Sequence, residues 1–484
     1  MKREGNIDAD CNRYRLGTRA RIVMVASVLC LAASSAVCQT DAAKLIPSGQ
    51  IVDVTCAADS TQSYALYLPS TYASAKQWPI IYFFDPGGRG RRPVELYKDL
   101  AEKYGFVLAA SNNSKNFASD ESKSVNAIWQ DTHLRFALDA HLTYVSGFSG
   151  GARVAGLMAL TCQQCQIAGV IAHGAGYPTN WAESKDRLLY FFAVGNQDFN
   201  WAEVMTVRRQ REDEGLAYRV LVFPGPHLWA PAAVMQDAIE WLMLKAMQTG
   251  ARPPDPALID RRFHSTQEEA EVAETKGDAV AQLAVYRSLV SDFAGLRNVS
   301  EYENKLAALK KSAALKAALK NERAEMSDQA ALENEVSSKM QAYVNGTADD
   351  SVTLGNDILQ AMRRLADDAE HAKNETKRLI ARRAFDELWV AGVENGQQEL
   401  ESRHFEKADA CFDLMSKVRD DPWPVLLLAE THTAAGNRKL AIKDLREAVR
   451  RGLNDAAAIE SNERLQTLKS DPDFQKLMAE LKRD

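Results

Sequence analysis

The run from Tyr144 to Arg153, YVSGFSGGAR, constrains the fold of this 484-residue chain more than any other segment. It places a G-x-S-x-G pattern between an apolar strand and a sequence that is compatible with a helix. A serine at such a turn projects its hydroxyl above the edge of a sheet, and the crowded backbone requires small neighbours. The pattern predicts that Ser149 is a nucleophile. Because glycine and serine are common in loops, this prediction also depends on the other motifs of the chain.

A second buried strand is predicted upstream, at 78–84, and it is followed by the glycine-rich loop DPGGRG. Pro86 has no N–H, so a backbone donor from this loop must come from Gly87 or Gly88. Together with the N–H of Gly150, such a donor would hold the oxyanion of a tetrahedral intermediate. The alternative is a Pro-Gly turn with a purely structural role.

Two further strands end in residues that could complete a catalytic triad. The apolar run 188–194 is followed by Asp198, and the run 218–223 is followed by His227. A carboxylate on one imidazole nitrogen orients the ring, so that the other nitrogen can take the serine proton. In an open α/β sheet the ligand site lies beyond the carboxyl ends of the strands, where Ser149 and both of these residues fall. Structural alternatives are a helix cap for Asp198 and a loop residue satisfied by backbone for His227.

Residues 45–247 resemble a minimal α/β-hydrolase, most closely the secreted polyhydroxybutyrate-depolymerase, feruloyl-esterase and acetyl-esterase group. The resemblance rests on four motifs: DPGG at 85–88, GFSGG at 147–151, GNQD at 195–198 and GPHLW at 225–229. It implies an α/β fold, with a mostly parallel sheet and helices on both faces. It also implies hydrolysis of a carboxylic ester by Ser149, Asp198 and His227 through an acyl-enzyme. Many relatives have His-Gly where this chain has DPGG.

The surroundings of the site are less strongly indicated. About fifty residues separate Ser149 from Asp198, and they show no lid segment, so we expect a shallow, open site. Such a site suits an ester on a larger molecule. Trp229 is predicted to wall the substrate pocket, with core packing as the alternative. Arg89 could meet an acidic substrate, or be a solvated charge of the loop.

Composition limits the remaining function classes. The net charge of −6 argues against nucleic-acid binding, which requires a basic surface. The length and the 46% of hydrophobic residues are typical of two or three domains with sizeable cores. We expect no metal and no organic cofactor, because the reaction class needs none and the sequence shows no ligand cluster.

The first 38 residues have the pattern of a secretory signal peptide. Two arginines precede the apolar run 22–33, and small residues follow at 34–36. The apolar run is short for a transmembrane helix, and an uncleaved anchor is the alternative. Cys38 directly follows a valine, which makes a lipid anchor there the less favoured interpretation. We therefore expect an exported, periplasmic or extracellular protein without a membrane span after cleavage.

Cys162 and Cys165 form the one close pair among the seven cysteines. No second C-x-x-C or histidine pair accompanies them to complete a zinc site. A local disulfide in an oxidising compartment is the preferred interpretation, and two free buried thiols are the alternative.

The second half of the chain changes character. After a Pro-rich linker the strand signals disappear, and Ala, Glu, Lys and Leu dominate. The predicted organisation is a signal peptide, a hydrolase domain, the linker, a helical region and a repeat region, at 1–38, 39–248, 249–256, 257–389 and 390–484.

A tetratricopeptide-like repeat is predicted in the last of these regions. Ala-x3-Phe at 408–412 recurs as Ala-x3-Leu at 441–445, 33 residues later, and small residues at such spacings let helices pack closely. The repeats could bind a peptide or protein, or form a helical buttress for the hydrolase domain.

Two functional classes follow from these patterns. The first is an exported serine esterase with a helical accessory domain, and a serine peptidase of the same fold is a variant of it. The second is a binding protein that uses the repeats, with the hydrolase fold as a scaffold without catalytic function.

Overall fold

The computed structural model describes residues 46–117, 120–178, 188–346 and 351–482. The predicted signal peptide and Cys38 lie outside these ranges. Among the helices within them, none combines the length and the apolar character that a membrane crossing requires.

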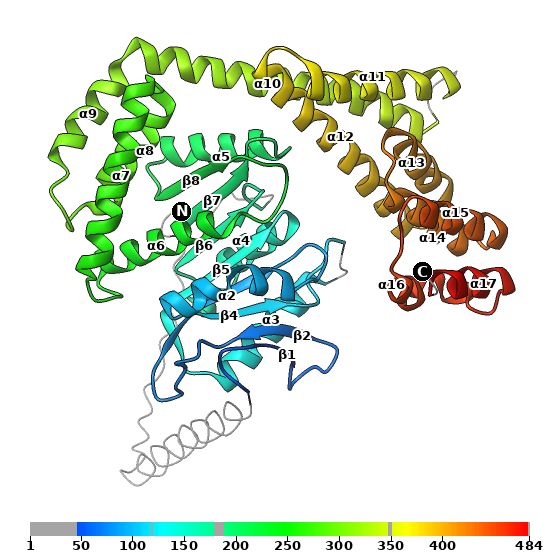
Figure 1. Ribbon diagram of the computed structural model, residues 1–484, viewed down its shortest axis with the longest axis horizontal. Helices are drawn as coiled ribbons and strands as arrows, with labels where there is room; N and C mark the ends of the chain where they lie inside the picture. Colours follow the sequence, from blue (N-terminus) through cyan, green and yellow to red (C-terminus); the bar gives the residue numbers. More distant parts are fainter. Residues whose placement is uncertain (1–45, 118–119, 179–187, 347–350, 483–484) are drawn as a thin grey trace, which may run out of the picture.

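An eight-stranded sheet forms the centre of the first half (Figure 1). Its order is β1-β2-β4-β3-β5-β6-β7-β8; β2 is antiparallel to both of its neighbours, and all other adjacent strands are parallel. The strands are β1 (Ile51–Thr55), β2 (Ser63–Tyr67), β3 (Trp78–Phe84), β4 (Val107–Ser111), β5 (Leu138–Phe148), β6 (Gly169–His173), β7 (Leu189–Gly195) and β8 (Tyr218–Phe223).

Helices cover both faces of the sheet. One face packs against α2 (Arg91–Tyr104) and α6 (Ala232–Thr249), and the other against α3 (Glu121–Arg135), α4 (Gly150–Thr161) and α5 (Trp201–Asp213). All seven residues of β3 are buried, because this central strand faces apolar side chains on both sides. The predicted mostly parallel sheet between two helical layers is confirmed, and it is the α/β-hydrolase fold.

The second half is helical throughout its described residues, as predicted. Its helices are α7 (Pro256–Lys276), α8 (Ala279–Phe293), α9 (Ser300–Lys311), α10 (Ala313–Val344), α11 (Ser351–His371), α12 (Glu375–Glu401), α13 (Phe405–Val418), α14 (Pro422–Ala434), α15 (Arg438–Arg450), α16 (Ala456–Ser461) and α17 (Pro472–Leu481). Short 3₁₀ helices occur at Gln163–Cys165 and Glu463–Leu468. The helix α12 passes without a break through residue 390, where the sequence suggested a boundary between two regions.

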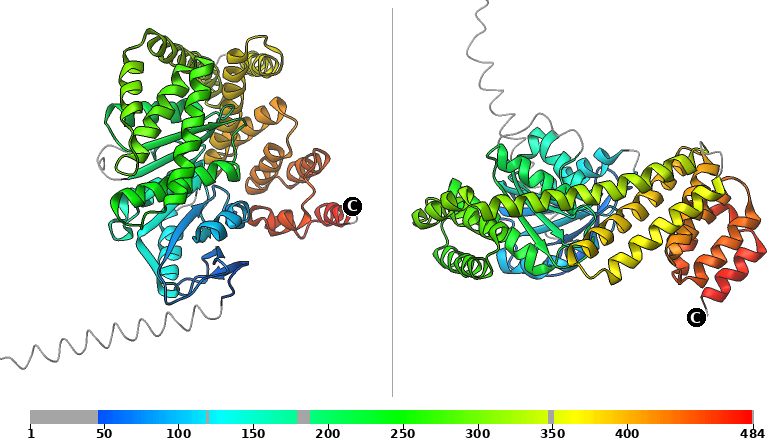
Figure 2. Two further views of the ribbon diagram at one scale, coloured as in Figure 1. Left: turned by 60° about the vertical axis from the view of Figure 1, so that its left-hand side comes forward. Right: turned by 90° about the horizontal axis from the view of Figure 1, so that it is seen from above.

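The helices lie against the hydrolase domain in two places. Helices α7, α8 and α9 share a hydrophobic core with α6 and one face of the sheet. The long helix α10 then crosses the domain, α11 runs back along it, and α12 runs again in the direction of α10 toward α13–α17 (Figures 1 and 2). The second core of the helical region includes residues of α10–α14.

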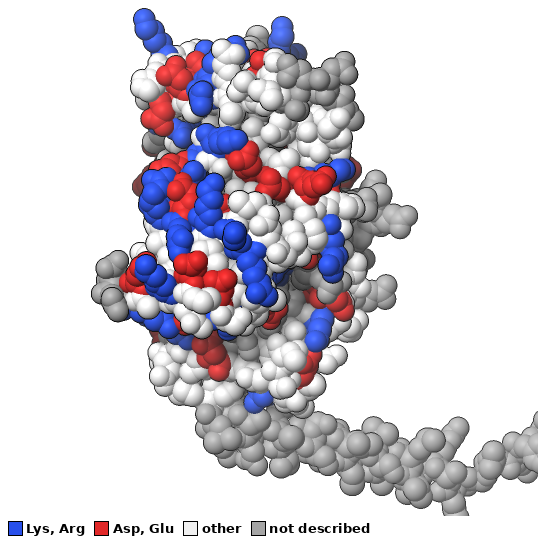
Figure 3. All heavy atoms as spheres, turned by 90° about the vertical axis from the view of Figure 1, so that its right-hand side faces the viewer, with Lys and Arg blue, Asp and Glu red and all other residues white. Residues whose placement is uncertain are grey.

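Successive helices from α12 to α15 pack on one another. The small residues Ala408, Ala429 and Ala441 are fully buried between them, which allows close contact. The tetratricopeptide assignment of these helices remains a prediction. On the face at this end of the molecule, acidic and basic side chains are intermixed (Figure 3).

Candidate active site

Ser149 lies at a sharp turn between β5 and α4. Its backbone has φ +53° and ψ −123°, a conformation that an L-residue adopts only under strain. A Cβ atom on Gly147 would lie 2.1 Å from the carbonyl oxygen of Gly151, and one on Gly151 would lie 2.0 Å from that of Phe84. The two glycines of the motif are therefore required by the close approach of three backbone segments, and the turn exposes the serine at the carboxyl end of β5.

The predicted acid and base form a hydrogen-bonded pair. Asp198, in the turn after β7, is fully buried, and its Oδ1 atom lies 2.9 Å from His227 Nδ1. The same oxygen accepts the backbone N–H of Asn200 at 2.8 Å. Because Nδ1 is engaged by the carboxylate, Nε2 is the nitrogen that remains for proton transfer.

Two phenylalanines place the imidazole between the serine turn and the acid turn. The His227 ring lies 4.4 Å from the Phe148 ring and 4.1 Å from the Phe199 ring, measured between ring centroids. Phe148 directly precedes Ser149, and Phe199 directly follows Asp198. The fold thus brings the three residues that the sequence indicated to the carboxyl ends of β5, β7 and β8.

The loop after β3 is organised around a buried carboxylate. Asp85 is fully buried and accepts the N–H of Gly87 at 2.8 Å, and its backbone oxygen accepts the N–H of Gly88 at 3.0 Å. Both backbone donors that the sequence suggested for the oxyanion are therefore engaged within the loop.

Arg89 and Trp229 also serve this carboxylate. The Arg89 Nε atom pairs with Asp85 at 2.8 Å, and the indole N–H of Trp229 donates to it at 2.9 Å. Burial acts to raise the pKa of Asp85, but hydrogen bonds from Arg89, Trp229 and Gly87 hold it below its ordinary value. Trp229 is 3% exposed, and neither side chain is among those that line the cavity beside Ser149. This differs from the substrate contacts that the sequence suggested for them, because a buried Asp85 needs donors.

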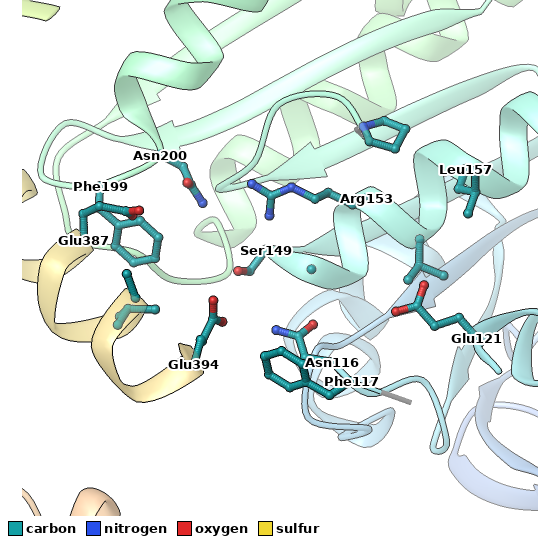
Figure 4. Close-up of a pocket in the computed structure, with 15 residues that line it drawn as sticks. Asn116, Phe117, Glu121, Ser149, Arg153, Leu157, Phe199, Asn200, Glu387 and Glu394 are labelled. Carbon is teal, nitrogen blue, oxygen red and sulfur yellow. The ribbon is translucent and has the colours of Figure 1, made fainter. Parts of the chain in front are cut away.

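A cavity of about 460 Å³ opens beside Ser149 (Figure 4). Part of its wall belongs to the hydrolase domain, and the opposite wall is α12, through Glu387, Val390, Ala391 and Glu394. The sequence analysis expected a shallow, open site and did not anticipate this wall. The covering element lies more than two hundred residues beyond Ser149 in the sequence, not between Ser149 and Asp198.

Two carboxyl groups of α12 enter this cavity. Glu394 is hydrogen-bonded to the side chain of Asn116, and Figure 4 shows both beside Ser149. Burial, and then the charges of Glu333 and Glu394, raise the pKa of Glu387 to about 7.

One cation faces this acidic wall of the cavity. Arg153 of α4 pairs with Glu203 at 2.9 Å, and its charge also acts on Glu387 and Glu394. The described residues that line the cavity include three carboxyl groups, of Glu121, Glu387 and Glu394, and one guanidinium, so the cavity is better suited to neutral or cationic groups than to anions.

Sequence reasoning missed Asn116, Glu387 and Glu394. Asn116 lies in the polar run SNNSKN, which has no periodicity to mark it. The two glutamates are seven residues apart, which puts them on one face of a helix, but charges on a helix usually face solvent. No group of three or more His, Cys, Asp or Glu residues in the described part of the chain is arranged to hold a metal ion.

Cys162 and Cys165 are joined by a disulfide at the end of α4. The described cysteines outside this pair, Cys56 and Cys411, are buried free thiols. Burial raises the pKa of the Cys56 thiol to about 11, so it is not a reactive thiolate at neutral pH.

No family model and no curated protein sequence matches this chain. Solved structures that resemble it include S-formylglutathione hydrolase from Staphylococcus aureus, at 14% identity over 40% of this chain and 98% of that enzyme, with a TM-score of 0.33. Others are an esterase from Pyrobaculum calidifontis (12% identity, 48% and 99% covered, TM-score 0.34) and the feruloyl esterase module from Clostridium thermocellum (17%, 41% and 88%, 0.31). Each of these similarities covers less than half of this chain.

Proposed function

We propose that the protein is a serine hydrolase that cleaves carboxylic esters, with Ser149 as nucleophile, His227 as base and Asp198 as acid. The observation that carries the proposal is the strained serine turn beside the hydrogen-bonded pair of His227 and buried Asp198. The strain holds the hydroxyl in an exposed position, and the buried carboxylate fixes the histidine tautomer. A scaffold without catalytic function would require neither.

The mechanism follows from this arrangement. His227 Nε2 takes the proton of the Ser149 hydroxyl while Oγ attacks the ester carbonyl carbon, and Asp198 stabilises the imidazolium that forms. The tetrahedral intermediate collapses as the imidazolium protonates the leaving alcohol, which leaves an acyl-enzyme. Water, deprotonated by His227, then attacks the acyl carbon and releases the carboxylic acid and the free serine.

The oxyanion needs two donors, and Gly150 N–H is the first in this proposal. Gly87 or Gly88 could act only after its N–H left Asp85. Asn116 lies beside Gly150 through its Oδ1 atom, which a Cβ atom there would approach to 1.9 Å, so its amide would have to turn before Nδ2 could donate to the oxyanion. The second donor in this proposal is therefore Gly87 or Gly88 once it leaves Asp85, or Asn116 once its amide turns.

The substrate would be an ester, free or attached to a polymer, whose reacting end enters the cavity. A peptide with a free amine is the second candidate, because Glu387 and Glu394 suit a cationic group near the scissile bond. The disulfide and the signal-like N-terminal sequence support an exported protein. The helices α13–α15 remain the surface proposed for a peptide or protein partner.

The test is labelling of residues 39–484 with a fluorophosphonate probe, followed by hydrolysis of a panel of nitrophenyl esters. The wild type is expected to label, and Ser149→Ala and His227→Ala are expected to lose both labelling and turnover. Ser146→Ala is the matched control, since this buried serine bonds His173 and not the triad. Labelling that persists in folded Ser149→Ala, or none in folded wild type, would overturn the proposal.

A further inference from the structure

One arginine of the helical region contacts the turn that carries Asp198. Arg383 of α12 is 2% exposed, and its Nε atom donates to the backbone oxygen of Asn196 at 2.8 Å. Its guanidinium also lies over the ring of Trp201, 3.8 Å from the centroid. Asn196 and Trp201 flank Asp198 in the sequence, so this single side chain holds both ends of the turn.

The guanidinium is itself held by a second helix. Its Nη1 atom pairs with Glu325 of α10 at 2.7 Å. Two residues of α10 add contacts to the same side of the hydrolase domain: Gln329 donates to the backbone oxygen of Phe199 at 3.3 Å, and Glu322 pairs with Arg208 of α5 at 2.5 Å. Arg383 thus links the turn to α10.

The inner side of the turn is tied to the loop that carries His227. Asn196 N–H donates to Phe223, Gln197 N–H donates to Gly225, and Gly225 N–H donates to the Asn196 side chain. These bonds set the spacing between the two loops, but they leave the outer side of the turn open. Arg383 and Gln329 donate to this outer side, and the charge of Arg383 also acts on the Asp198 carboxylate.

We propose that Arg383 is a positioning residue for the catalytic acid, so that the helical region is a working part of the active site and not a separable accessory. This inference rests on the proposed function of the Ser149–His227–Asp198 group. Without Arg383, the Asn196 carbonyl loses its buried donor, which is unfavourable for the conformation of the turn. The turn would relax, and Asp198 would orient His227 less accurately.

Loss of the positive charge has a separate, electrostatic consequence. A cation beside Asp198 offsets part of the negative charge that favours the His227 imidazolium. Removing it strengthens the attraction between the Asp198 carboxylate and a protonated ring. The acidic limb of the rate profile would then move to higher pH, which a purely structural role would not produce.

The experiment compares Arg383→Gln and Arg383→Lys with Arg419→Gln in the full exported chain. Arg419 is the matched control: it lies over Trp389, 4.6 Å from the centroid, and pairs with Asp386 at 2.5 Å, both within the helical region. We expect Arg383→Gln to lower kcat roughly ten- to a hundredfold with little change in KM, and to move the acidic limb upward. Arg383→Lys should leave the pH of the acidic limb unchanged and have a kcat between those of the wild type and Arg383→Gln. Arg419→Gln should change neither kcat nor the pH of the limb.

Hydrogen exchange of the turn 195–201 makes the test independent of activity. We expect faster exchange there in Arg383→Lys and Arg383→Gln than in the control. If Arg383→Gln does not fold, the result for Arg383→Lys decides the test. The inference would be overturned if the folded Arg383 variants had the same kcat, the same pH of the acidic limb and the same rate of hydrogen exchange in the turn as the wild type. Absence of hydrolysis and labelling in the wild type would instead refute the proposed function, while the exchange result would still decide whether Arg383 holds the turn.

Discussion

The side chains of Asn116 and Glu394 are hydrogen-bonded to one another beside Ser149, which joins the loop after β4 to α12. This bond puts a carboxyl group of the helical region in the wall of the cavity. Whatever acyl or alcohol group enters the cavity must meet that carboxyl group. The helical region should therefore influence which substrates are accepted.

The charge of the substrate is the first property to test. At pH 8, above the raised pKa of about 7 of Glu387, the wild type should hydrolyse the 4-nitrophenyl monoester of glutaric acid more slowly than the neutral methyl ester of the same compound. The ionised Glu387 and Glu394 then repel the free carboxylate. Glu394→Gln should reduce that preference about fivefold, which corresponds to roughly 1 kcal/mol. The ratio of kcat/KM for the two esters is the measurement.

A matched control for this substitution lies on the same helix. Glu399 pairs with His404 and is not among the residues that line the cavity, so Glu399→Gln should leave the ratio at its wild-type value. An unchanged ratio in Glu394→Gln would show that the substrate does not approach α12.

The raised pKa of Glu387 predicts a pH dependence of stability. Burial and the neighbouring carboxylates Glu333 and Glu394 raise this pKa from 4.5 to about 7, against the opposing charge of Arg153, so the folded state holds a proton that the unfolded state has released. Stability from this group is complete below about pH 4.5 and is lost as the pH rises through 7. The glutamine of Glu387→Gln does not titrate, so the variant should become more stable relative to the wild type as the pH rises over this range.

Urea unfolding at pH 5 and at pH 8 measures the effect. The gain of Glu387→Gln at pH 8 should be on the order of 1–3 kcal/mol, and it should be much smaller at pH 5. Glu399→Gln again provides the comparison. Equal effects of Glu387→Gln at both pH values would mean that Glu387 is ionised freely in the folded protein.

Gly174 offers a test of the acid–base pair that leaves its residues in place. This glycine has φ +59°, and a Cβ atom there would lie 2.8 Å from Asp198 Oδ2 and 3.0 Å from His227 Cε1. Gly174→Ala should therefore displace the pair and lower kcat by roughly a hundredfold. Gly215 also has a positive φ, of +68°, but has nothing within 4 Å of a Cβ atom, so Gly215→Ala controls for backbone strain. Loss of activity in both variants to the same degree would attribute the effect to strain.

The sequence predicted the strands and the residues at their ends because both carry local signals. Strand β3 is buried on two faces, which produces an uninterrupted apolar run, and the serine turn tolerates only small neighbours. Chain order then placed Asp198 and His227 after the correct strands.

The walls of the site could not be predicted in the same way. The contact between α12 and the serine turn joins residues far apart in the sequence, and no local pattern encodes it. The role of Asp85 was missed for a related reason. Arg89 and Trp229 were interpreted separately, as residues that could contact the substrate. In the structure, both side chains point toward the buried Asp85 carboxylate, because it needs donors.

A histidine of the helical region provides the last prediction. His432 of α14 lies 2.9 Å from Asp409 and 2.6 Å from Asp444, and hydrogen bonds to these two carboxylates raise its pKa to about 9. Its stabilising contribution should be complete below about pH 6.5, where the unfolded chain is also protonated, and should be lost as the pH rises through 9. His432→Gln should therefore unfold at a lower temperature than the wild type at pH 6.5, and the difference should close by pH 10. His264→Gln, at an exposed histidine whose Nδ1 bonds a carbonyl of its own helix, should show no such trend in thermal unfolding followed by circular dichroism. A constant difference for His432→Gln across this range would mean that packing, and not the charge on the ring, holds α13, α14 and α15 together.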